Sequence, residues 1–249
     1  MVQAAQDVGE VYGGSDGSVP FGLRRREPDP RAGHSGRCRW GQVEGAPGEP
    51  YRRSGRIMAS APPFTTRLLR HGLPPGTVGT VASLGEELRA RTQHTGKEYA
   101  AMIDAASGAL VGAVLEGSSS KVDITPHLQL LAAAGAYVQL HTHPSPLSFS
   151  RHDVALLINI PPIRSMIVYA QGTRCYAMTK SAQWDRLLGK TSPEGLTRRM
   201  VELYEEARGS RAIRQTYRAH QVRGDADAAA IDAIWGAIAP RLSLRYISY

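Results

Sequence analysis

The stretch LHTHPSPLSFSRHDVALL, Leu140 to Leu157, lies between two apolar segments and holds three of the chain's 8 histidines and one aspartate. The residues around its beginning, AYVQLHTH, are short and mostly apolar, which predicts an interior strand. Ser150 and Asp153 are typical of a helix start, with serine at the N-cap and an acid at the third helical position. Pro161-Pro162 then ends that helix. We therefore predict a buried strand, a loop and a helix in succession.

The histidines of this stretch suit a metal ion. Residues two apart on a strand point to the same side, so His141 and His143 present both imidazoles on one face. The loop after them can fold the helix start back and bring Asp153 to the same place. Two histidines, one carboxylate and an open fourth position describe a catalytic zinc site. Two alternatives stay open: Ser150 and Asp153 as a helix cap only, and His152 as a ligand.

The flanking sequence predicts an α/β core followed by helices. Apolar residues at helical spacing indicate a helix around residues 78–88. Alternating patterns with turn residues indicate two hairpins, one turning at Ala106-Ser107-Gly108 and one at Gly172. Thr125 and Pro126 predict the cap and first position of another helix, which ends at Gly135. Only helical patterns follow Ser181, so we expect a core domain at 64–181 and an all-helical extension at 182–249.

The first part of the chain has a different composition. Residues 1–57 hold 11 of the 26 glycines and 5 of the 16 prolines and show little apolar periodicity. Such a segment buries too little surface to offset its ordering entropy, so we predict that it is disordered. Met58 is an alternative start of translation. The two cysteines, Cys38 and Cys175, are expected to be free thiols, because two cysteines make no disulfide framework.

Composition narrows the class of protein. Hydrophobic residues make up 42 % of the 249 residues, which is enough for a buried core. No apolar run approaches the ~18 residues of a membrane helix, and the N-terminus lacks an apolar signal core, so we expect a cytoplasmic protein. The net charge of +8 could favour an acidic partner. No basic run exceeds Arg24–Arg26 and aromatic residues are not interleaved, so the sequence gives nucleic-acid binding little support.

The motif His-Thr-His-Pro at the end of an apolar strand, followed by Ser-x-x-Asp at a helix start, resembles the JAMM (MPN-type) zinc metallopeptidases, which include RadC-like relatives. The resemblance covers roughly residues 78–180. It implies a cytidine-deaminase-like mixed β-sheet flanked by helices, with zinc held by His141, His143 and Asp153. It also implies that Ser150 helps to stabilise an oxyanion and that an upstream glutamate activates the water. Glu98, at the start of a predicted strand, is the best match for that glutamate.

The resemblance leaves several points open. Glu116, at the end of the next predicted strand, is the alternative general base. Six residues separate His143 from Ser150, where the family usually has seven. The implied activity is hydrolysis of an amide or isopeptide bond, with a peptide or a ubiquitin-like protein as substrate. An inactive MPN-type scaffold and a RadC-like protein associated with DNA are the alternatives, and oligomerisation through the C-terminal helices stays open.

Overall fold

The computed structural model describes residues 63–249. The predictions for residues 1–57, for Met58 and for Cys38 lie outside this part. Cys175 is buried and forms no disulfide. None of the helices in residues 63–249 combines the length and apolar character needed to cross a membrane.

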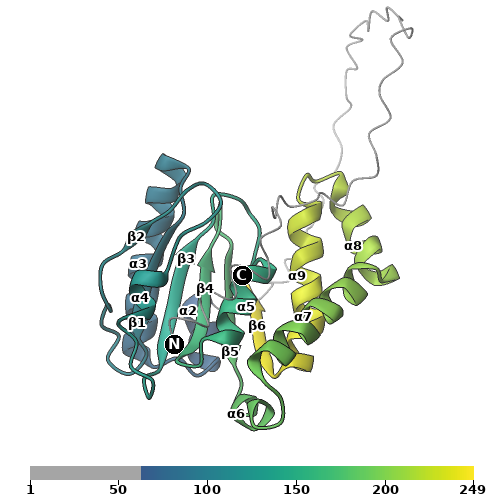
Figure 1. Cartoon of the computed structure of the whole chain (residues 1–249). Helices are drawn as coiled ribbons and strands as arrows, with labels where there is room; N and C mark the ends of the chain where they lie inside the picture. Colours follow the sequence, from purple (N-terminus) through teal and green to yellow (C-terminus); the bar gives the residue numbers. More distant parts are fainter. Residues whose placement is uncertain (1–62) are drawn as a thin grey trace, which may run out of the picture. The chain divides into compact units, whose positions relative to one another are not determined.

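A six-stranded mixed sheet is the centre of the fold (Figure 1). Its strands are ordered β2-β1-β3-β4-β5-β6. The central pair, β3 and β4, is parallel, and every other neighbouring pair is antiparallel. The mixed α/β class predicted from the sequence is confirmed. The strands are β1 (Tyr99–Asp104), β2 (Leu115–Glu116), β3 (Tyr137–Thr142), β4 (Ile163–Tyr169), β5 (Cys175–Lys180) and β6 (Leu244–Ser248).

Two helices, α2 (Phe64–Arg70) and α3 (Pro75–Thr95), cover one face of the sheet. The predicted helical spacing is confirmed, because Val78, Val81 and Leu88 of α3 are buried against this face. They pack in one apolar cluster with alternate residues of the strands, including Val138 and Leu140 of β3. The approach is close at one point of α3. A Cβ at Gly85 would lie 2.2 Å from a ring carbon of Tyr169.

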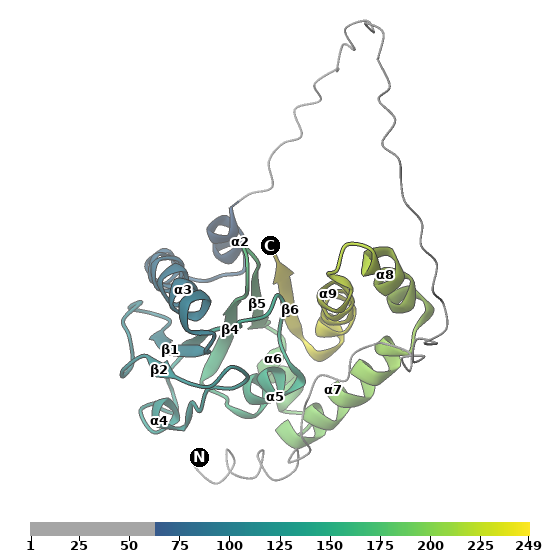
Figure 2. The ribbon, with the colours of Figure 1, turned by 90° about the horizontal axis from the view of Figure 1, so that it is seen from above.

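The other helices follow in the order α4 to α9. Helix α7 packs against both α5 and α9. Helix α5 contacts β4 and α7, and α9 contacts β6 (Figure 2). The largest buried side chains outside the strands are Trp184 and Trp235. The helices are α4 (Thr125–Leu128), α5 (Arg151–Asn159), α6 (Trp184–Leu188), α7 (Pro193–Arg208), α8 (Arg211–Gln221) and α9 (Ala226–Ile238), followed by a 3-10 turn at Ala239–Leu242.

The all-helical extension is the main correction to the predicted fold. After α9 the chain returns to the sheet, and β6 pairs antiparallel with β5 from Tyr176↔Ser248 to Lys180↔Leu244. Ser243, at φ 54°, makes the turn into this strand. Residues 63–249 belong to one compact unit.

Two predicted elements are shorter than expected. Helix α4 ends at Leu128 rather than at Gly135, and Thr125 is its first residue rather than its cap; the N-cap is Ile124, and the Asp123 carboxylate accepts the Thr125 N–H at 2.9 Å. The first hairpin turns at Gly108, as predicted, at φ 72°. Its second strand is interrupted, so that only β2 and an isolated bridge from Leu110 to Ile103 pair with β1. The second hairpin, β4–β5, turns at Gly172 as predicted.

Candidate metal centre

Strand β3 positions the two histidines. Every residue of β3 is buried, and its alternate side chains face opposite sides of the sheet. Leu140 faces the α3 side, so His141 faces the other side. His143 is one residue past the strand, and its N–H donates to the Tyr169 carbonyl at 3.0 Å, which continues the pairing with β4. Both side chains are buried, with relative exposures of 2 % for His141 and 8 % for His143.

Helix α5 brings the carboxylate. Ser150 is its N-cap, and the Ser150 Oγ accepts the Asp153 N–H at 3.1 Å. The Asp153 Oδ2 in turn accepts the N–H of Ser150 at 2.7 Å and its hydroxyl at 2.8 Å. This capping box fixes the carboxylate beside the histidines, at 3.6 Å from His141 Nε2 and 3.8 Å from His143 Nε2. Capping and proximity to the histidines therefore occur together, and the six-residue loop is long enough to allow both.

The imidazoles turn their lone pairs toward each other. The Nδ1 of His143 is 3.1 Å from the Leu147 carbonyl, which only accepts, so this nitrogen carries the proton. The Nδ1 of His141 donates to the Gln139 Oε1 at 2.9 Å. Both Nε2 atoms are then unprotonated in the neutral rings, although they lie 3.0 Å apart. Two lone pairs and a carboxylate converge with no donor among them, which is the arrangement that a cation resolves.

The charges fit the same interpretation. Burial lowers the pKa of His143, and His141 lowers it further, against the opposing effects of Asp153 and Glu98. Burial would raise the pKa of Asp153, but the two histidines in their charged form and the hydrogen bond from the Ser150 hydroxyl hold it below its ordinary value. A neutral imidazole and an ionised carboxylate are the forms that bind metal. The three ligand atoms lie within 4.8 Å of one another, and a donor set of two nitrogens and one oxygen suits zinc.

Glu98 lies beside this group. It immediately precedes β1, where its N–H donates to the Ser118 carbonyl at 2.7 Å, and its relative exposure is 8 %. Burial raises the pKa of Glu98 to about 7; His143 lowers it and Asp153 raises it, so the carboxyl is within electrostatic range of both. Its oxygens are not among the atoms that converge, which leaves it next to the centre rather than in the ligand set.

The other sequence candidates lie elsewhere. Glu116 is exposed, pairs with Lys97 and accepts the Tyr99 hydroxyl at 3.2 Å. It is not part of the cluster. His152 is exposed on α5 and does not join the ligand group either. The sequence did not identify Gln139, although a polar residue two before His141 on a buried strand is a usable signal.

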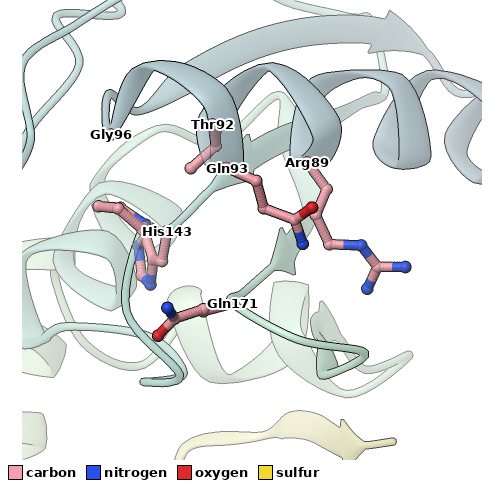
Figure 3. Close-up of a pocket in the computed structure, with 7 residues that line it drawn as sticks. Arg89, Thr92, Gln93, Gly96, His143 and Gln171 are labelled. Atoms are coloured by element: carbon pink, nitrogen blue, oxygen red, sulfur yellow. The ribbon is translucent and has the colours of Figure 1, made fainter.

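A cleft of about 380 Å³ opens on one side of His143 (Figure 3). It runs between the C-terminal part of α3 and the loops after β3 and β4. In Figure 3 the amides of Gln93 and Gln171 extend into the space between the helix and the loop. His143 belongs to both the cleft and the metal cluster, so the cleft borders the cluster at this residue. The lining residues are Arg89, Thr92, Gln93, Gly96, His143, Pro144 and Gln171.

Comparison with known proteins identifies no relative: no family model matches the chain, and neither a curated protein nor a solved structure matches it significantly. The mixed α/β fold and the cluster of His141, His143 and Asp153 are therefore described from the structure alone.

Proposed function

We propose that this protein is a zinc-dependent hydrolase that cleaves an amide or isopeptide bond in a protein or peptide. The proposal is carried by one observation, the convergence of the His141 and His143 Nε2 atoms on the Asp153 carboxylate with a buried glutamate beside them. The motif resemblance to the JAMM peptidases, described above, supports the same reaction.

His141, His143 and Asp153 would hold the metal. Three protein ligands leave a fourth position for water or substrate, which is the arrangement of catalytic zinc sites. Zinc held by these residues would lower the pKa of a bound water toward about 7 and would polarise the substrate carbonyl. Gln139 and the Leu147 carbonyl hold the two rings in the Nδ1–H tautomer, so that each Nε2 stays available.

Glu98 is the proposed general base. A base works best when its pKa lies near the operating pH, and burial raises the pKa of Glu98 to about 7. The positive charge of a bound ion would favour the carboxylate, so Glu98 would enter the reaction deprotonated. It would accept a proton from the attacking water and deliver it to the leaving amine.

Ser150 has a positioning role that its capping bonds support. Its single hydroxyl hydrogen is donated to the Asp153 Oδ2. Stabilisation of an oxyanion by this hydroxyl would require that hydrogen to turn from the carboxylate to the substrate. We propose both roles for Ser150, with the positioning of Asp153 as the main one.

The substrate class follows from the cleft. Apart from Arg89 and His143, its lining side chains are uncharged, and the Gln93 and Gln171 amides can both donate and accept hydrogen bonds. Such a surface suits the backbone of an extended polypeptide. We therefore propose the extended tail of a protein, of the kind found in ubiquitin-like proteins, as the segment that binds here.

Metal content is the first test. The full-length chain should bind one zinc per molecule, and His141→Ala/His143→Ala should abolish binding. The matched control is His152→Ala, which removes an exposed histidine on α5 and should retain the metal. A wild-type protein that binds no zinc after metal-free purification and reconstitution would refute the proposal.

Hydrolysis is the second test. Isopeptide-linked and C-terminally extended ubiquitin-like proteins serve as substrates. Glu98→Gln should keep zinc and lose at least about 10²-fold in kcat. Glu116→Gln, at the exposed alternative, should keep its activity. Equal activity of the Glu98 variant and the wild type would remove Glu98 from the mechanism, and a wild type that binds zinc without cleaving any substrate would favour a scaffold.

A further inference from the structure

Helix α8 carries a basic surface that the proposed hydrolase does not use. From Arg208 to Gly224 the chain has five arginines and no carboxylate. Three of them, Arg211, Arg214 and Arg218, are exposed on α8. Successive helical residues are rotated by about 100°, so these three lie within about 60° of one another on one face. We call them the α8 basic row.

The opposite face of α8 is packed. Ile213 is its buried residue, and the helix lies against α9. Figures 1 and 2 show α8 on the outer side of the α7–α9 group, away from the sheet. The packed face therefore fixes the orientation of the helix and directs the α8 basic row to solvent.

The carboxylates that border this segment are engaged with other cations. Glu206 pairs with Arg241 at 3.5 Å, and Asp225 pairs with Arg174 at 3.0 Å and with His220 at 2.9 Å. Within residues 63–249, no carboxylate forms an ion pair with any member of the α8 basic row. Arg214 donates to the Gly209 carbonyl, which leaves its charge uncompensated. The α8 basic row is thus a local group of exposed positive charges without carboxylate partners in the described part of the chain.

We propose that the α8 basic row binds the phosphate backbone of duplex DNA without reading its sequence. Arg211 and Arg218 are about 10 Å apart along the helix, at about 1.5 Å per residue, a span that can follow successive phosphates. The planar guanidinium group forms paired hydrogen bonds with phosphate oxygens. This inference does not depend on the metal centre.

The character of the exposed face favours duplex DNA over a membrane surface or a single strand. A membrane-surface helix needs a free apolar face, but Ile213 is already buried and Val222 is the single exposed large apolar residue at this end of the helix. Single strands are bound by stacking on exposed aromatic rings, and Tyr217 of α8 is half-buried and has a partner. The row offers regularly spaced charge and little else, which suits a rigid array of phosphates.

The test uses the full-length protein, a short fluorescent duplex of mixed sequence and anisotropy between about 50 and 200 mM salt. Wild-type protein should bind with a steep salt dependence. Arg211→Gln/Arg214→Gln/Arg218→Gln should weaken binding at least tenfold at the lower salt and reduce the slope of log K against log salt by about 2.7, from three contacts of about 0.9 each. Circular dichroism and zinc content should match those of wild type.

Two further variants make the test specific. Arg70→Gln/Arg186→Gln/Arg198→Gln removes the same charge from exposed arginines on α2, α6 and α7, and should leave the slope close to that of wild type. Arg211→Gln/Arg218→Gln spares the bond from Arg214 to Gly209 and should reduce the slope by about 1.8, from two contacts of about 0.9 each, if the first variant is unstable.

Four outcomes would overturn the inference. The first is a wild type that does not bind the duplex at low salt. The second is an equal loss in the α8 variant and the scattered control, which would show a general charge effect. The third is tighter binding of single strands than of the duplex. The fourth is binding of anionic phosphatidylserine vesicles without binding of the duplex.

Discussion

The hydrogen bond from His141 to Gln139 should control zinc affinity, and Gln139→Met tests this directly. Methionine keeps the length of the side chain and removes the amide acceptor. In the wild type, the Gln139 Oε1 accepts from the His141 Nδ1 at 2.9 Å, and both side chains have relative exposures of only 2 %. Without that acceptor, the metal-free ring can move its proton to Nε2 and donate to the His143 Nε2, which is 3.0 Å away.

The magnitude follows from two costs of binding zinc in the variant. The new bond between the histidines, worth about 0.5–1.5 kcal/mol, must be broken, and a buried Nδ1–H must be left without an acceptor, at about 1–3 kcal/mol. A total near 2–3 kcal/mol weakens zinc binding by about 30- to 150-fold, at about 1.4 kcal/mol per tenfold. Losses of about 10- to 100-fold are usual for such partners of metal-binding histidines.

Competition with a chromogenic chelator measures the affinity of the full-length protein for zinc. Gln139→Glu, which keeps an acceptor at the same place, should bind at least as tightly as the wild type. Gln183→Met makes the same substitution at an exposed position before α6 and should have no effect. Zinc affinity of Gln139→Met within about threefold of wild type would show that the tautomer is not fixed by this bond and would refute the reasoning.

Three further predictions concern stability. Burial lowers the pKa of Lys180 from 10.5 to about 7. Between these two pH values the unfolded chain binds more protons than the folded protein, so the free energy of unfolding rises with pH by up to about 1.4 kcal/mol per pH unit. In urea unfolding, Lys180→Met should lack that rise, and below pH 7 its free energy of unfolding should depend on pH as that of the wild type does. Ser150→Ala should lose about 1–2 kcal/mol in urea unfolding and also bind zinc more weakly, whereas Ser192→Ala, at the N-cap of α7, should lose stability alone. Gly85→Ala should lower the thermal midpoint, because the new methyl group would lie 2.2 Å from the buried ring of Tyr169 and overpacking costs about 1–3 kcal/mol. Gly79→Ala, where the methyl group has open space, should raise the midpoint.

The local part of the fold could be predicted because its signals lie within a few residues. The strand before His143, the N-cap at Ser150 and the stop before Pro161 each depend on neighbouring positions, and the structure places β3 and α5 accordingly. The same proximity explains the metal cluster: a strand sets the direction of both histidines, and a capping box sets that of Asp153.

The parts that were missed depend on distant contacts. β6 is five residues long, and its partner β5 lies more than sixty residues earlier in the chain. The residues near Leu244 therefore carry no local signal that predicts this pairing. The second strand of the first hairpin was predicted longer than it is. At its end Gly117 lies close to the Lys121 carbonyl, where a Cβ would lie at 2.2 Å, and its N–H donates to the carbonyl of Glu98, the residue before β1. Position 98 could be proposed only through a motif, because it lies just outside β1 and its backbone N–H bonds to the distant Ser118 carbonyl.

The missed strand and the metal centre are physically connected. Phe149, in the loop between His143 and Ser150, packs edge-on against His141 at a centroid distance of 6.4 Å and against Tyr246 of β6 at 6.2 Å. Its carbonyl accepts the Trp235 indole N–H of α9 at 2.8 Å.

The loop that brings Asp153 to the histidines is therefore packed against, and hydrogen-bonded to, residues of α9 and β6. This support explains why a short loop with two prolines can keep a defined path over the strand end, and why the helices after residue 181 cannot be treated as a separate attachment. A protein ending at residue 181 would lose both β6 and the indole of Trp235, and with them the contacts that fix the loop between His143 and Ser150. The candidate metal centre is in this sense a property of the whole described chain rather than of the histidine motif alone.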